Sequence, residues 1–272
     1  MGKIATNRIK SWKKIHDLSD SDIWIYRGQA NPEWNLKTTL ERCFQFHNVP
    51  AAESACVENE LCREFRRAYH QYSQHVPDPE DHIEWLSLMQ HHGAPTRLLD
   101  FTYSIYVAAY FAIENARDEC AIWAVNATWA LKTAADLFRR NGANEDALTA
   151  LGANIIEKRD PKVCPLFFGN STTDAACTMN PFRLNDRLRT QKGLFLMPGN
   201  VKKPFMENLE AMPGHDKLKN VKKIIIRGRI LDEARQQVFD MNITRRTLFP
   251  GLDGYAQALG VYHRAFRPYV RK

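Results

Sequence analysis

The sequence has none of the short motifs that mark common nucleotide, metal and hydrolase sites. It contains no phosphate-binding G-x-x-x-x-G-K-[ST] loop, no dinucleotide-binding G-x-G-x-x-G, no H-E-x-x-H zinc helix and no G-x-S-x-G nucleophile turn. Its six cysteines include no C-x-x-C pair, which argues against a zinc site or a disulfide framework. They are typical of scattered thiols in a reducing compartment.

Long apolar runs are also missing. The longest, at 105–113, is too short to cross a bilayer, and residues 1–15 lack the apolar segment of a secretory signal. A cytoplasmic protein without a membrane segment is therefore expected.

The charge balance is basic. The 272 residues include 38 Lys and Arg against 31 Asp and Glu, which leaves a net charge of +7. Such an excess favours polyanionic partners, nucleic acid above all, although a merely solubilising surface would give the same number.

Strand and helix patterns occur without strict alternation, and no linker or repeat divides the chain. The sequence predicts an α+β protein with a helical extension over 1–20 and one elaborated domain over 21–272. Extended segments are expected at 22–29, 96–101, 120–126, 163–168, 188–197, 221–227 and 247–249. Helices are expected at 51–74, 81–91, 128–140, 145–158, 230–241 and 252–264.

The stretch 90–112 is the most informative part of the chain. A short strand there leads directly into a helix that Thr102 or Ser104 caps, and the alanines of that helix let another backbone approach closely. The free N–H groups at such a helix start suit a phosphate or carboxylate, although a plain packed corner has the same pattern.

The strand at 22–29 has bulky residues on both faces and is expected to be central in its sheet. It ends in Arg27 and Gly28. Because glycine leaves room for a ligand and a guanidinium binds phosphate in a bidentate way, this end suits phosphate binding. An ion pair with a carboxylate under a turn is the alternative.

His91 and His92 are adjacent and point to different sides of a helix, which suits a metal poorly, and no metal is expected. A helix-end histidine that satisfies backbone carbonyls is one reading of this pair. The arginines and the hydroxyl and amide groups near the strand ends instead predict a metal-free cleft for a phosphorylated or dinucleotide ligand.

A set of motifs in fixed order resembles the FRG-domain family. The motifs are YRGQ at 26–29, W-x-L at 34–36, EWLSLMQHHGAPTRLLDFTYS at 84–104, AAYFA at 108–112, RTQKGLF at 189–195 and LFPGLDG at 248–254. Together they span about residues 20–262. The layout is similar to the ADP-ribosyltransferase fold, so the resemblance implies a mixed β core with flanking helices.

The resemblance also implies a site that uses NAD as substrate. Residues implied to bind NAD are Tyr26, Arg27, Gly28, Gln29, Thr96, Arg97, Thr102 and Tyr103. Gln191 would take the place where many active transferases have a Glu on a third strand, and Asp100 is the nearest substitute carboxylate. Arg27, Asp100 and Gln191 are therefore the expected catalytic residues, with His91 and His92 on the acceptor side.

The activity implied is transfer of ADP-ribose to a macromolecule. The basic composition makes a nucleic acid, RNA before DNA or protein, the favoured acceptor. The family's occurrence among bacterial defence genes implies a toxin of a toxin–antitoxin phage-defence system, with an antitoxin protein as partner. A non-catalytic phosphate-binding module and an NAD glycohydrolase are the alternatives.

Overall fold

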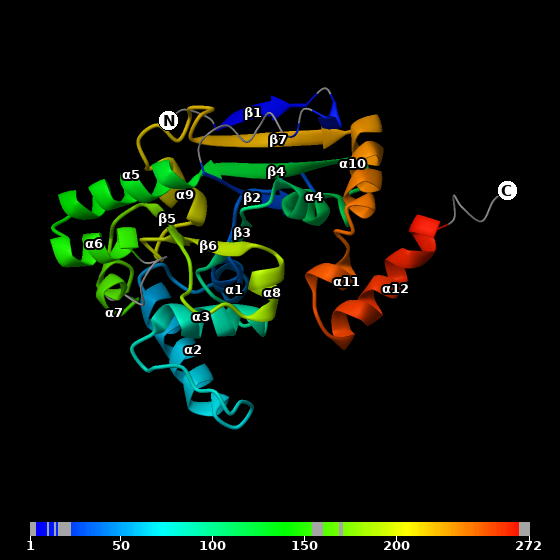
Figure 1. Ribbon diagram of the computed structural model, residues 1–272. Helices are drawn as coiled ribbons and strands as arrows, with labels where there is room; N and C mark the ends of the chain where they lie inside the picture. Colours follow the sequence, from blue (N-terminus) through cyan, green and yellow to red (C-terminus); the bar gives the residue numbers. More distant parts are fainter. Residues whose placement is uncertain are drawn as a thin grey trace.

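A seven-stranded sheet forms the centre of the computed structural model, which describes residues 4–9, 11–13, 15, 23–153, 160–168 and 171–266. The strand order is β1-β7-β4-β2-β3-β6-β5 (Figure 1). The strands are β1 (Ala5–Arg8), β2 (Trp24–Gln29), β3 (Leu99–Thr102), β4 (Glu119–Asn126), β5 (Ala176–Met179), β6 (Gly193–Pro198) and β7 (Val221–Arg227). β1 runs parallel to β7 and the other neighbouring pairs are antiparallel, so the predicted mixed sheet is confirmed.

Helices cover both faces of the sheet (Figure 1). They are α1 (Thr39–His47), α2 (Ser54–Tyr69), α3 (His82–His91), α4 (Ile105–Ile113), α5 (Ala127–Arg140), α6 (Glu145–Ala153), α7 (Asp160–Val163), α8 (Asp186–Thr190), α9 (Phe205–Glu210), α10 (Arg229–Asp240), α11 (Arg245–Leu248) and α12 (Leu252–Phe266). α4 and α10 pack in one apolar core, and α3, α5, α6 and α9 pack in the other.

The predicted central position of β2 is confirmed, since the strand lies between β4 and β3. Trp24 and Tyr26 are buried in the core with α4, while Ile25 is buried in the other core. Alternate residues of a strand point to opposite faces, so β2 is covered on both sides.

α4 lies directly against β2 at Gly28. A Cβ atom added to Gly28 would lie 2.0 Å from the Ala108 carbonyl oxygen and 2.4 Å from the Ala112 nitrogen. The prediction that the alanines of α4 admit another backbone is therefore confirmed. The prediction that Gly28 leaves room for a ligand is wrong, because the helix fills that space.

Capping residues set the start of two predicted helices. Ser104, the expected cap of α4, accepts a hydrogen bond from Val107 N, and Asp81 accepts one from Glu84 N at the start of α3. Thr102, the alternative cap, instead accepts from Ser104 N.

Two of the predicted extended segments are wrong, and a third is right only over residues 193–197, where β6 lies. The predicted strand at 188–197 begins as α8, because Asn185 caps that helix and Lys192 has a left-handed backbone with φ of 48°. Segment 163–168 is helical, since Pro165 has no N–H for a sheet ladder and starts a 3₁₀ turn. Segment 247–249 falls mainly in α11, which Thr244 starts with a capping box.

The helical extension predicted for 1–20 is wrong at residues 5–8, which pair with β7 as β1. Residues 1–3, 10, 14 and 16–20 of that prediction, and residue 22 of the next strand, lie outside the described residues. The predicted helix at 51–74 is shorter, at 54–69, and the one at 145–158 is described only to residue 153. Among the described residues, no helix has the length and apolarity needed to cross a membrane.

Gly28→Ala is expected to destabilise the protein by about 1–3 kcal/mol or more, because the added methyl meets main-chain atoms that cannot rotate away. Urea unfolding measures this change. Gly152→Ala in α6 is the matched control: the added methyl has no heavy atom within 4 Å, so a gain of about 0.5–1 kcal/mol is expected. Equal stability of Gly28→Ala and wild type would contradict the close contact.

Candidate functional site

A polar cluster lies where β2 and β3 run side by side. Arg27 Nη1 donates a 2.7 Å hydrogen bond to the Asp100 carbonyl oxygen and lies 3.8 Å from Asp100 Oδ2. The two side chains keep 21% and 39% of their exposure, so a ligand can reach both the guanidinium and the carboxylate.

Neighbouring elements hold the Asp100 carboxylate in place. Gln90 of α3 donates from Nε2 to Asp100 Oδ2 at 2.9 Å, and its Oε1 accepts from the Thr96 hydroxyl at 2.5 Å. Thr39 of α1 accepts from Thr96 N at 3.0 Å. The Gln90 amide cannot turn over without losing these bonds, so the network fixes which face of the carboxylate stays open.

The Arg27 guanidinium is partly buried and has few hydrogen-bond partners. Burial lowers the pKa of Arg27, Asp100 opposes that change, and the nearby Arg42 lowers the pKa further. Arginine nevertheless stays charged. Arg27 Nε is buried and has no hydrogen-bond partner among the described residues. Arg42 is exposed and forms no ion pair with any residue of the described ranges.

The other predicted residues of β2 have structural contacts. Tyr26 is 2% exposed and lies in the apolar core, and Gly28 packs against α4. Gln29 accepts from Trp123 Nε1 at 2.8 Å and donates to the Asn35 carbonyl at 3.2 Å. These contacts place none of the three side chains in the cluster.

Arg97 is buried away from solvent and is paired. Its guanidinium donates to both carboxylate oxygens of Glu58 and to the Phe167 carbonyl, and it lies over the Phe168 ring. The side chain is 2% exposed, so the predicted phosphate contact is replaced by a buried ion pair.

The resemblance implied that Gln191 lies on a strand, but the structure places it at the end of a helix. It ends α8, and its buried amide donates from Nε2 to the Leu248 carbonyl at 3.1 Å. Its own carbonyl accepts from the Thr102 hydroxyl at 2.7 Å, which joins this turn to β3. The three expected strand regions therefore are neighbours, but the Gln191 side chain is directed to α11 and not to the cluster.

Tyr103 follows β3 and is 39% exposed. Its hydroxyl donates to Asn180 Oδ1 at 3.2 Å. Burial raises the pKa of Tyr103 more than this hydrogen bond lowers it, so the ring stays neutral at ordinary pH. An accessible, neutral aromatic ring suits stacking on a planar group.

His91 and His92 are exposed at the end of α3, with ring centroids 4.8 Å apart. Neither imidazole makes a hydrogen bond to a described residue, so neither satisfies the helix-end carbonyls. Burial lowers the pKa of His91, and the charges of His92 and Arg187 lower it further.

Sequence reasoning missed three residues of the cluster: Thr39, Arg42 and Gln90. Gln90 lies in the predicted helix at 81–91 and in the motif at 84–104, which was a signal for it. Thr39 and Arg42 lie in a segment that no motif marked.

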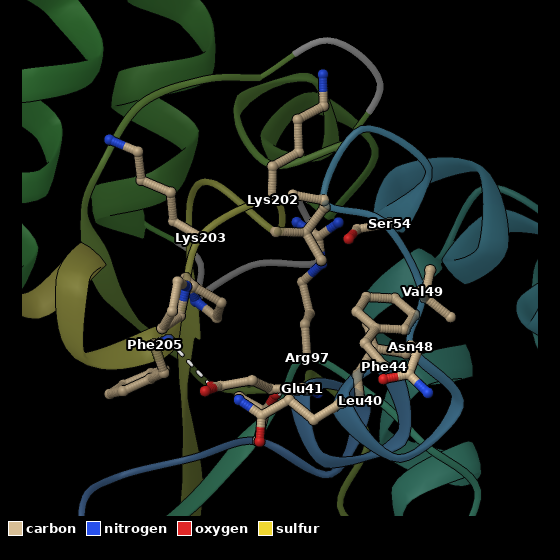
Figure 2. A pocket seen from close by; sticks show the side chains of 16 residues that line it. Leu40, Glu41, Phe44, Asn48, Val49, Ser54, Arg97, Lys202, Lys203 and Phe205 are labelled. Carbon is tan, nitrogen blue, oxygen red and sulfur yellow. Dashed lines mark hydrogen bonds between the residues drawn. The ribbon is translucent and has the colours of Figure 1, made fainter.

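A separate cavity of about 430 Å³ lies between α1 and the segment that leads into α9 (Figure 2). Arg97 is the one predicted residue in its lining. Glu41 accepts from Phe205 N at 3.1 Å, and burial raises the pKa of Glu41 in spite of that bond. Leucine, phenylalanine, valine and proline side chains line the cavity together with polar and charged ones, among them Lys202 and Lys203.

The cluster lies in the part of the chain that carries the recognisable motifs. Residues 22–120 match the FRG domain. The match includes Arg27, Gln90, Thr96 and Asp100, and therefore the whole hydrogen-bonded core of the cluster. It ends before Gln191 and the elements that follow. Neither the curated proteins nor the solved structures include one that matches the chain.

Glu58→Gln is expected to destabilise the protein by about 3–5 kcal/mol, because it leaves the buried Arg97 cation without its carboxylate. Urea unfolding measures the change. Glu60→Gln, the same substitution at an exposed site of α2, is expected to stay within about 0.5 kcal/mol of wild type. Similar stabilities for the two variants would show that Arg97 does not depend on Glu58.

Arg187→Ala is expected to raise the pKa of His91, because it removes a positive charge that disfavours the imidazolium. Proton NMR titration of the imidazole signals measures this. Arg63→Ala on α2 is the control, since it also removes one positive charge and Arg63 is not among the causes of the shift. An unchanged His91 titration would place α8 farther from the end of α3.

Proposed function

We propose that the chain is an ADP-ribosyltransferase that consumes NAD and modifies nucleic acid, RNA in particular, and that Arg27 and Asp100 form its active site. The observation that carries the proposal is a reachable guanidinium, with a buried Nε that lacks a partner among the described residues, beside a carboxylate that Gln90 holds. Guanidinium groups bind phosphates in a bidentate way, and a carboxylate stabilises positive charge at a sugar C1 atom.

The proposed reaction breaks the bond between C1′ of the nicotinamide ribose and the nicotinamide nitrogen. Nicotinamide leaves as a neutral molecule with the bonding electron pair. A lone pair of the acceptor forms the new bond to C1′, and the acceptor's proton passes to Asp100 or to water. With water as the acceptor, the same steps amount to NAD hydrolysis.

Each residue of the site has a separate role in this proposal. Arg27 and Arg42 hold the phosphates, Asp100 stabilises the developing charge, and Tyr103 stacks on nicotinamide. His91 lies on the acceptor side with its neighbour. Gln191 is no longer assigned to catalysis, because its amide holds Leu248.

The biological setting is proposed from the resemblance and the charge. FRG motifs at 22–120 and a net charge of +7 support a toxin of a phage-defence system that acts on nucleic acid in the cytoplasm and that an antitoxin protein controls.

A non-catalytic module that binds a nucleotide phosphate is the second candidate. Two observations favour this candidate. Asp100 Oδ2 already accepts a hydrogen bond from Gln90, and the Gln191 amide bonds the Leu248 carbonyl instead of a group of the cluster. The module requires Arg27 but not Asp100 for binding.

Arg27→Ala and Asp100→Asn are expected to lower kcat/KM for nicotinamide release by about 10²-fold or more, since each removes a charge that stabilises the transition state. Gln191→Ala is expected to lower it far less. The measurement uses NAD labelled in its adenylate part, with total RNA, single-stranded DNA or protein as acceptor. Arg63→Ala, an exposed arginine of α2, is the matched control for removal of one charge.

The outcomes separate the candidates. Label on RNA together with nicotinamide release supports the transferase, and release without labelled macromolecule supports the glycohydrolase. Saturable NAD binding that needs Arg27, survives Asp100→Asn and gives no release supports the binding module. Wild-type protein that neither binds nor cleaves NAD would end the proposal.

A further inference from the structure

We propose that the surface formed by α8, α11 and the exposed side of α12 binds single-stranded nucleic acid, with Arg187, Arg246 and Tyr255 as the binding residues. These elements adjoin one another, because Gln191 at the end of α8 bonds Leu248 of α11, and α11 packs on α12 (Figure 1). The role of this surface as the acceptor site rests on the proposed function. Nucleic-acid binding itself does not.

Arg187 is a cation without an anionic partner among the described residues. Its Cζ lies 4.9 Å from the centroid of the Phe249 ring, and Arg245 Cζ lies 4.6 Å from the same centroid. Glu114 neutralises Arg245 at 2.7 Å, whereas the Arg187 side chain forms neither an ion pair nor a hydrogen bond with any residue of the described ranges. A guanidinium that lies over a ring keeps N–H groups at its edge for a phosphate.

A second arginine repeats the arrangement on α11. Arg246 Cζ lies 5.4 Å from the centroid of Tyr255, and Arg246 is exposed and has no ion pair within the described part of the chain. Tyr255 keeps 44% of its exposure, and Leu252 and Leu259 beside it on α12 keep 79% and 53%. Cations interleaved with accessible aromatic rings are the pattern by which proteins hold a nucleic-acid strand.

The charges of these elements complement a polyanion. Of the acids on these elements and beside them, Asp186 pairs with Arg189 and Glu114 pairs with Arg245, and Asp253 lies in the first turn of α12. From residue 254 to 272 the sequence has four Lys and Arg residues and neither Asp nor Glu. The excess of positive charge therefore extends through the sequence that follows Asp253.

Exposed rings distinguish a single strand from a duplex. The 44% exposed ring of Tyr255 can stack only on bases that are not already paired within a helix. The Thr102–Gln191 hydrogen bond joins this surface to β3, which carries Asp100. A nucleic-acid strand bound to this surface lies next to the polar cluster of Arg27 and Asp100 that the proposed function uses.

The test measures binding without NAD. Fluorescence anisotropy with labelled mixed-sequence single-stranded RNA, single-stranded DNA and duplex DNA, over a range of salt concentrations, gives the affinities. Wild type is expected to prefer both single strands over the duplex. The double variant Arg187→Ala and Arg246→Ala is expected to bind about tenfold or more weakly. The slope of log K against log salt is expected to become shallower by about 0.7 for each phosphate that the variant no longer neutralises.

Two further variants keep the test independent of folding defects. Tyr255→Ala is expected to weaken binding severalfold, while Tyr255→Phe retains the ring and the affinity. The double variant Arg63→Ala and Arg67→Ala on α2 removes the same charge and is expected to bind as wild type does.

Several results would overturn the proposal: no binding of single strands by wild type, a duplex bound as tightly as a single strand, or equally weakened binding in the two double variants. Self-association through the apolar residues of α12, in place of nucleic-acid binding, would assign this surface to a second copy and overturn it too. Because NAD is absent, failure of NAD turnover leaves this test unaffected.

Discussion

The close contact between the backbones of β2 and α4 sets the arrangement of the candidate site. Gly28 permits the contact, because no side chain separates the strand from the Ala108 carbonyl. With α4 on that face, β2 is buried as a central strand and the preceding residue, Arg27, points to the other face. There β3 brings Asp100 alongside. One position without a side chain thus places a cation and a carboxylate together.

The cluster combines fixed and open groups. Gln90 and Thr96 tie the carboxylate to α3 and to the loop before β3, while the guanidinium is anchored through a main-chain carbonyl. Groups held by packed elements lose little conformational freedom when a ligand binds. The open atoms that remain, with Arg42 nearby, are what a phosphorylated ligand would meet.

Local signals in the sequence predicted much of this arrangement, and long-range partners account for most of what it missed. The strand-to-helix unit ending at residue 112 was predicted because a proline, a capping serine and spaced alanines lie within a short stretch. A shared site for Arg27 and Asp100 was implied by the family resemblance, and the hydrogen bond between them is what the structure adds. The direction of Gln191 depends on Leu248, 57 residues away, and the burial of Arg97 depends on Glu58, 39 residues away. No local pattern reports such partners.

The pairing of β1 with β7 has a consequence for how the chain assembles during translation. Residue 5 pairs with residue 222, so β1 cannot pair until β7 has been synthesised. β2, β3 and β4 all lie before residue 127 and can join as soon as that part has emerged. Because closing a long loop costs more entropy than closing a short one, the inner strands are favoured to form first. β2, β3 and β4 would then be paired before β1 joins the edge of the sheet.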